Sequence, residues 1–224
     1  MSARAASRAA VPPPEAKASR RQILDCAARL FREQGYAAVS LRDIAAASGM
    51  KAGSLYHHFV SKEEIVAEML NIGVQTVFGE VRRAIEAAGD VPAAHLIETA
   101  VRAHLRSIFE FGDYTGASIR IFGHVPARVR DATIGERDAY ERYWVALLAR
   151  GARLGDLRGD IDLTLLRLFL FGAMNWALEW YKPGRLDLDG IARQLGEIIL
   201  HGAAPVRAPP ANRRVRRTGQ TAKP

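Results

Sequence analysis

Residues 40–64 have the sequence SLRDIAAASGMKAGSLYHHFVSKEE, and this stretch decides the fold of the chain. Ser40 precedes an apolar series with the spacing i, i+3, i+4 and i+7 that begins at Leu41, and Asp43 stands where a short capping-box acid belongs. The pattern predicts a helix over residues 41–48. Gly49 follows at the point where a helix end favours a residue that tolerates a positive φ.

A second, shorter helix is predicted over residues 51–59. Leu55 and Phe59 have the spacing i, i+4 and form one apolar side, while the other side is polar. Ser61 and Glu64 then provide the capping box of a third helix. This order is typical of a helix-turn-helix unit that reads DNA. The alternative is an ordinary three-helix cluster with a solvated polar face.

The candidate DNA contacts are donor side chains, together with small residues that allow close approach to a groove. They are Ser40, Arg42, Lys51, Ala52, Gly53, Ser54, Tyr56, His57 and Lys62. The first turn of the helix that begins after Ser61 also offers backbone N–H groups to a phosphate.

This stretch, with the preceding helix 20–34, resembles the amino-terminal domain of the TetR family of bacterial transcriptional repressors. The residues that carry the resemblance are Phe31, Gly35, Tyr36, Ser40, Leu41, Ile44, Ala45, Gly49, Ser54, Leu55, Tyr56, His58, Phe59, Lys62 and Glu63. The resemblance covers about the first third of the chain. It implies a homodimeric repressor that binds palindromic operator DNA and leaves it when a small molecule binds.

The rest of the chain is predicted to be helical, so the fold class is all-α. Helices are expected from residue 62 to 88 and over 92–112, 116–123, 127–155, 162–181 and 187–201, with no alternation typical of strands. The predicted domains are a disordered basic arm (1–19), a helix-turn-helix domain (20–66), an effector-binding and dimerisation domain (67–203) and a disordered basic tail (204–224).

The segment 163–181 is apolar nearly all the way round, so a helix there must be covered on more than one side. We expect a second subunit on one side, with the last helix adding an amphipathic stripe to a four-helix interface. The predicted interface residues are Leu166, Phe169, Leu170, Ala173, Ile191, Leu195 and Ile198. A wholly intramolecular core is the alternative.

The carboxy-terminal region resembles a subset of TetR regulators that respond to acyl-CoA thioesters. The resemblance rests on Asn175-Trp176, Trp180-Tyr181-Lys182-Pro183-Gly184, Leu186 and Ile191, and the chain departs from it in lacking a further glycine after Gly184. It implies an effector between the central helices. The predicted lining is Phe109, Phe111, Tyr114, Ile119, Arg120, Phe122, Trp144, Met174 and Trp176. Plain core packing explains the aromatic residues equally well.

Arginines near this predicted slot are the candidates for binding a CoA phosphate. They are Arg120, Arg128, Arg130, Arg137 and Arg142, of which Arg120 is the first choice. Solvated helix faces are the alternative explanation for these side chains.

The net charge of +8 does not by itself indicate DNA binding. Residues 1–21 hold five Lys or Arg and one Glu, and residues 205–224 hold six and no acid, which leaves 22–204 with 21 basic and 23 acidic residues. The prediction of DNA binding therefore rests on the motif. The amino-terminal arm, with Arg20 and Arg21, either solubilises the protein or reaches the DNA.

Other classes of protein have little support in the sequence. Cys26 is the single cysteine, so an intrachain disulfide is excluded and a reducing cytoplasm is the expected location. No signal segment, membrane-spanning stretch, nucleotide-binding glycine loop, metal cluster or cofactor motif is found, which argues against an enzyme. The rival functions are a regulator of efflux genes with an aromatic drug-like effector and a DNA-binding protein without an effector.

Overall fold

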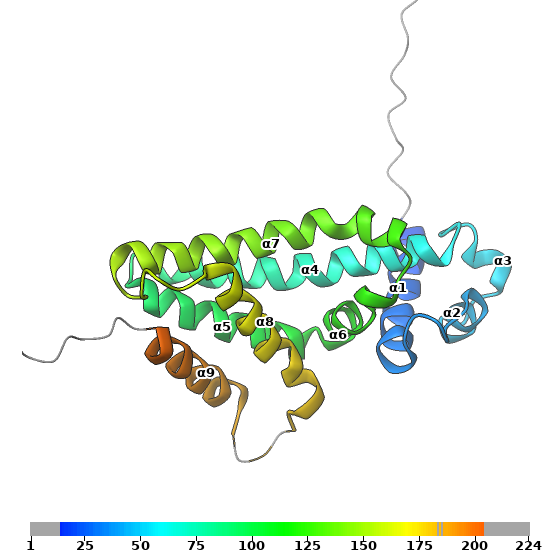
Figure 1. The fold of residues 1–224 in the computed structure, drawn as a ribbon. Helices are drawn as coiled ribbons and strands as arrows, with labels where there is room; N and C mark the ends of the chain where they lie inside the picture. The colour runs from blue at the N-terminus through cyan, green and yellow to red at the C-terminus, as the bar shows by residue number, and fades with distance from the viewer. Residues whose placement is uncertain (1–13, 183, 185, 204–224) are drawn as a thin grey trace, which may run out of the picture.

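The computed structural model describes residues 14–182, 184 and 186–203, and every regular element in this part of the chain is a helix (Figure 1). The prediction of an all-α fold is confirmed. The elements are α1 (Pro14–Gln34), α2 (Leu41–Ala47), α3 (Ala52–Leu55), α4 (Lys62–Ala88), α5 (Ala93–Glu110), α6 (Gly112–Ile121), the 3-10 turn η1 (Phe122–His124), α7 (Ala127–Leu154), α8 (Leu163–Trp180) and α9 (Leu188–Ala203).

The capping box at Ser40 forms as the sequence predicts, whereas at Ser61 only the serine half of the predicted box forms, because the Glu64 carboxylate accepts from the Val60 N–H at 2.8 Å. The Asp43 backbone N–H donates to Ser40 Oγ at 3.3 Å, and the Ser40 N–H donates to the Asp43 carboxylate at 2.8 Å. Gly49 ends the turn with φ of 67°, a conformation that costs a side-chain-bearing residue energy. At α4, Ser61 accepts from the Glu64 N–H at 3.1 Å. These bonds satisfy backbone groups that would otherwise be unpaired at the helix ends.

Helix α1 begins at Pro14, six residues before the predicted start, so the prediction of a disordered arm over 1–19 is wrong for residues 14–19. Proline is well suited to the first turn of a helix, and the sequence that follows it, EAKAS, contains strong helix formers. Residues 1–13 of the predicted arm and the predicted tail 204–224 lie outside the described residues.

Two hydrophobic cores are joined by α4, which runs without a break from the DNA-reading end into the body. The first core surrounds Phe31, Leu55 and Phe59 and continues into α6 and the first turn of α7 at Val129. The second surrounds Trp144 between α4, α5, α7 and α8. The predicted domain boundary between residues 66 and 67 falls inside α4, so a displacement in the body can be transmitted along a continuous helix.

The body is built around the long helices α4 and α7, with α5 alongside them (Figure 1). Helix α6 lies between α1 and α4. Helices α4 and α6 approach closely at Gly73 of α4, where a Cβ atom would stand 2.8 Å from the carbonyl oxygen of Tyr114 in α6. Helix α9 packs on α5, where Arg106 pairs with Asp189. Within the described residues, no helix combines the length and apolar character needed to cross a bilayer.

Candidate DNA-binding surface and effector pocket

The short helix α3 exposes a polar surface and is held by buried side chains behind it. Leu55 and Phe59 are buried, as their spacing predicts. Seven of the nine predicted DNA contacts are exposed and have side chains that form no hydrogen bond or ion pair with the described residues: Arg42, Lys51, Ala52, Gly53, Ser54, Tyr56 and His57. Tyr56 is 54% exposed although it is large and partly apolar, and no atom would block a Cβ at Gly53. The surface therefore offers donors around a point where a partner can come close to the backbone.

The remaining two predicted contacts, Ser40 and Lys62, are engaged within the protein. Ser40 is exposed, but its hydroxyl is bonded to Asp43 at the start of α2. Lys62 Nζ donates to the Tyr36 carbonyl oxygen and lies 4.0 Å from the centre of the Tyr36 ring. Burial lowers the pKa of Lys62. Lys62 thus joins α4 to the link between α1 and α2, and its ammonium group is not a free cation.

Arg20 and Arg21 are also held by protein contacts. Arg20 forms ion pairs with Glu64 and Glu68 and lies 3.9 Å from the centre of the Phe59 ring, which joins α1 to α4. Arg21 is exposed and pairs with Asp25 at 3.0 Å. Arg20 therefore stabilises the helix-turn-helix unit, and in this conformation it does not extend toward a partner.

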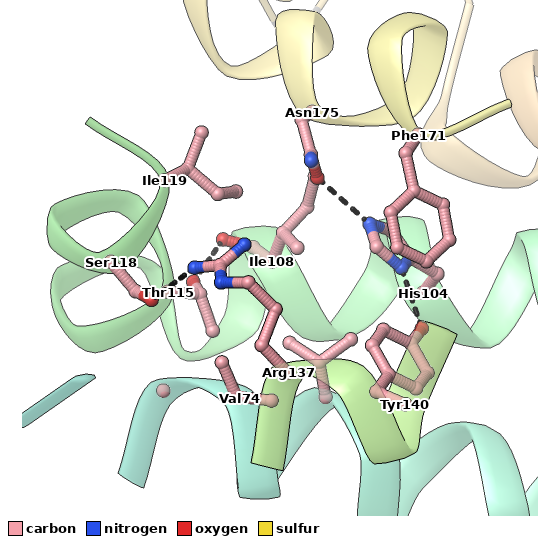
Figure 2. Close-up of a pocket in the computed structure, with 12 residues that line it drawn as sticks. Val74, His104, Ile108, Thr115, Ser118, Ile119, Arg137, Tyr140, Phe171 and Asn175 are labelled. Carbon is pink, nitrogen blue, oxygen red and sulfur yellow. Dashed lines mark hydrogen bonds between the residues drawn. The ribbon is translucent and has the colours of Figure 1, made fainter. Parts of the chain in front are cut away.

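A small pocket lies in the middle of the body, enclosed by α4, α5, α6, α7 and α8 (Figure 2). Its volume is about 40 Å³. The lining is Gly73, Val74, Val77, His104, Ile108, Thr115, Ser118, Ile119, Arg137, Tyr140, Phe171 and Asn175. Ligand pockets are typically about 300–1,000 Å³, so an apolar molecule of any length must push these helices apart to enter.

Three polar side chains form a connected chain on one wall of the pocket (Figure 2). Asn175 Oδ1 can only accept, so His104 Nε2 donates to it across 3.1 Å. His104 Nδ1 then accepts from the Tyr140 hydroxyl at 2.7 Å. Burial lowers the pKa of His104 to about 4 and raises that of Tyr140, so both groups are neutral at pH 7. The wall is polar and carries no charge.

The burial of His104 makes the stability of the fold depend on pH. The unfolded chain takes up a proton near pH 6.5 and the folded chain near pH 4, so stability falls as the pH is lowered through this window. We expect the free energy of unfolding to decrease by about 2 kcal/mol between pH 7 and pH 5 from this residue.

Urea unfolding at the two pH values measures this effect, and His104→Gln is the comparison because an amide keeps a donor but does not titrate. The variant should lose most of the pH dependence. Equal wild-type stability at pH 5 and pH 7 would show that His104 is protonated in the folded state or is not buried.

The nine predicted effector residues do not share one cavity. Ile119 alone lines the central pocket. Phe109, Phe111 and Tyr114 line a separate open hollow of about 400 Å³ beside α1, and Tyr114 donates to Asp25 there at 2.6 Å.

The other predicted effector residues are distributed between core and surface. Trp144 and Met174 are fully buried in the second core, whereas Trp176 is 66% exposed and points out of the protomer. Phe122 lies half-buried with its ring 3.9 Å from the Arg137 guanidinium carbon. The prediction of one aromatic slot is wrong for this conformation, because helical periodicity does not reveal which aromatic faces a void and which fills the core.

The cation of the central pocket is Arg137 and not Arg120. Arg120 is exposed and lines an outer hollow of about 340 Å³ with Arg32, and Ile119 borders both spaces. The analysis from sequence missed His104 and Tyr140. A signal for His104 existed, because it occupies a position on the buried face of α5 between Ala100 and Ile108.

The predicted dimer residues separate into an outward and an inward group. Phe169, Ala173 and Ile198 are exposed, and Leu166, Ile191 and Leu195 are partly buried. Leu170 is buried in the protomer core, so its assignment to the interface is corrected. The exposed side of α8 forms one continuous stripe along the helix. We call it the α8 face, and it consists of Leu165, Leu168, Phe169, Gly172, Ala173, Trp176 and Trp180.

Comparison with known proteins agrees with this architecture. The model of the bacterial regulatory proteins of the tetR family matches residues 23–69, and the model of the tetracyclin repressor-like carboxy-terminal domain matches residues 90–203. Among solved structures, PfmR from Thermus thermophilus, a TetR family transcriptional regulator, is 29% identical with a TM-score of 0.70, covering 80% of this chain and 97% of that one.

Curated relatives extend the match over nearly the whole chain. The HTH-type transcriptional repressor KstR2 of Rhodococcus jostii is 34% identical over 204 residues, which are 86% of this chain and 97% of that repressor. The structure of the ketosteroid transcriptional regulator KstR2 of Mycobacterium tuberculosis is 27% identical with a TM-score of 0.69 and covers 84% of this chain and 95% of its own. The chain therefore belongs to the tetR family of bacterial regulatory proteins and is a DNA-binding transcriptional repressor homologous to KstR2, not an enzyme.

Proposed function

We propose that the protein is a homodimeric repressor that binds palindromic operator DNA and is released by an apolar acyl effector, with an acyl-CoA thioester as the first candidate. The observation that carries the proposal is the central pocket, because two of the helices that line it, α4 and α6, also contact the helix-turn-helix unit. A ligand that enlarges this pocket displaces the helices that hold the helix-turn-helix unit.

Operator binding is assigned to the exposed surface around α3. Lys51 and Arg42 provide charge for phosphates, and Tyr56, His57 and Ser54 provide donors and a ring that can reach base edges. Because Lys62 is bonded to Tyr36, its role in the proposal is to fix the start of α4 behind the reader. A homodimer presents two such surfaces, and related repressors of this geometry place them about 34–36 Å apart on DNA.

The second subunit is expected on the α8 face. Its large side chains are exposed in the single chain, with Phe169 and Trp176 each 66% exposed. Their spacing, i, i+3, i+4, i+7 and so on from Leu165 to Trp180, makes one continuous apolar stripe. Monomeric proteins rarely expose a contiguous apolar surface of this kind, and Ile198 of α9 is a further exposed apolar residue, at 70%.

The coupling route runs from the pocket through α6 to α1. Thr115 and Ser118 of α6 line the pocket, while Asp113 and Tyr114 of the same helix are bonded to α1. Helix α4 provides a second route because it carries Gly73 in the pocket wall and continues to the DNA reader. The tight contact at Gly73 supports this coupling, because α6 cannot shift toward α4 without moving it.

An apolar acyl effector is supported by the chemistry of the lining and by one relative. Valine, isoleucine and phenylalanine side chains make up much of the wall, and the relative from Mycobacterium tuberculosis is described as a ketosteroid regulator. The outer hollow lies next to Ile119 of the pocket, and Arg120 is the cation there that could meet a CoA phosphate, because Arg32 is paired with Asp113. Glu33 and Glu179 also line this hollow.

Fluorescence anisotropy of a labelled fragment from upstream of the gene tests the proposal. Protein is titrated onto the DNA, and octanoyl-CoA and octanoate are then added. We expect release by one of these compounds, and by reciprocity the operator should weaken ligand binding by the same factor. Tight DNA binding that no acyl compound changes would contradict the acyl effector and leave a drug-like effector or a repressor without an effector.

A further inference from the structure

The pocket contains a charged group with which no described carboxylate forms an ion pair. Arg137, from α7, extends into the pocket between α5 and α6 (Figure 2). Its side chain forms no ion pair with any described carboxylate, and its Nε atom is buried without a hydrogen-bond partner. Its one hydrogen bond within the described residues is the long contact from Nη2 to Ser118 Oγ, at 3.5 Å.

The surroundings of Arg137 remove part of its water without placing a carboxylate in contact with it. The Phe122 ring covers the guanidinium at 3.9 Å, and burial lowers the pKa of Arg137 more than the nearby charges of Glu141 and Asp138 raise it. Glu141, one turn along α7, is bonded to Arg167 at 3.0 Å. The neighbouring polar wall formed by His104 and its partners is neutral. A partly buried guanidinium without a carboxylate in contact is costly, and such a group in a pocket is a candidate for binding an anionic ligand.

We propose that the pocket binds the carboxylate of its effector, with Arg137 as the counter-ion. The planar guanidinium can donate two parallel N–H groups to the two carboxylate oxygens. Ser118 is buried, and the only hydrogen bond of its hydroxyl within the described residues is the long contact to Arg137, so it can donate a third bond to the same anion. The effector is therefore an apolar compound with a carboxylate at its buried end.

The size of the pocket fits this assignment. A volume of about 40 Å³ accommodates a carboxylate group but not an alkyl chain, so the head group can bind where the polar atoms already are. The apolar part of the ligand then has to open the space between α6 and α8, past Ile119. A simple thioester carbonyl carries no charge and would leave the guanidinium uncompensated. This inference rests on the proposed effector site and narrows its ligand from acyl compounds in general, simple thioesters included, to those that carry a free carboxylate.

Isosteric pairs of acid and amide test the inference, because they differ in charge and hardly in shape. The smallest pair, formate and formamide, fits the existing pocket, and the pair octanoate and octanamide requires it to open. Binding is measured by the thermal shift of the full chain at equal concentration, at pH 7 and at matched ionic strength. We expect each acid to bind about 10- to 100-fold more tightly than its amide.

Three variants identify the residue responsible. Arg137→Gln should remove the preference for acid over amide. Arg137→Lys should keep part of the preference, because lysine has the positive charge but not the two parallel N–H groups of the guanidinium. Arg142→Gln is the matched control, because Arg142 lies on the same helix with an exposed side chain outside the pocket. That variant should keep the wild-type preference. Circular dichroism establishes that each variant retains its helical fold.

The outcomes separate this inference from the proposed function. Equal binding of acid and amide for both pairs, or a preference that persists in Arg137→Gln, would overturn the carboxylate site. Release of operator DNA by octanoyl-CoA but not by octanoate would also overturn it, while the ligand-responsive repressor would stand. Acid binding that depends on Arg137 without release of any DNA would support the site and contradict the proposed effector response.

Discussion

Phe169→Glu is expected to convert the protein to a monomer and to weaken operator binding by at least about 100-fold. The proposed homodimer buries the α8 face, in which Phe169 is 66% exposed in the single chain. Two copies of the change would place two carboxylates in an apolar interface without counter-charges, which costs several kcal/mol. The affinity for DNA falls because a single reader loses the gain of about 10²–10⁴ that a linked second site provides.

Sedimentation velocity and anisotropy with operator DNA measure the two consequences. Trp176→Glu changes a second large side chain of the α8 face and should have the same two effects. Ile134→Glu is the control, because it introduces the same charge at a partly exposed apolar residue of α7 outside the α8 face. A dimer that persists in both α8 variants would show that the two subunits meet elsewhere.

Lys51→Ala and Tyr56→Ala are expected to impair DNA binding in different ways without affecting the fold. Both side chains are exposed, and neither has a hydrogen-bond partner within the described protein to lose. Lys51→Ala should weaken binding to all DNA sequences and reduce the slope of log affinity against log salt by about one per reader. Tyr56→Ala should lower the preference for the operator, at a cost of about 1–3 kcal/mol per reader.

Anisotropy titrations over a range of salt concentrations, with operator and with unrelated DNA, distinguish the two effects. Lys182→Ala removes the same charge from an exposed position beyond α8 and should leave binding unchanged. An unaltered salt slope in Lys51→Ala would mean that this ammonium group does not contact phosphate. Unchanged discrimination in Tyr56→Ala would restrict the tyrosine to a backbone contact.

The local structure of the reader could be predicted because its determinants are close together in the sequence. The capping box at Ser40 and the serine cap at Ser61 each span three residues, and Gly49 acts through its own φ angle. The pair Leu55 and Phe59 lies one helical turn apart, so its burial follows from the 3.6-residue period. None of these features depends on how the remote parts of the chain pack.

The partners of charged side chains could not be predicted from the sequence. Lys62 and Arg137 both looked available for an anion, yet Lys62 is bonded to the Tyr36 carbonyl oxygen from a segment 26 residues away. Arg137 enters the pocket from α7 and reaches Ser118 of α6, whereas Arg120 of α6 is exposed and lines an outer hollow. A contact between elements distant in sequence depends on crossing angles and helix phase, which periodicity does not encode.

The sequence by itself determined the helices, the DNA-reading motif and the family resemblance, because capping, helical periodicity and turn residues act over a few positions. Only the tertiary structure decided which side of the apolar helix α8 is core and which is exposed, so that Leu170 is buried and Phe169 is not. It also decided that His104, Tyr140 and Arg137, from α5 and α7, meet in one pocket. The physical reason is that a cavity forms where several helices fail to fill the space between them, and that depends on all their side chains together.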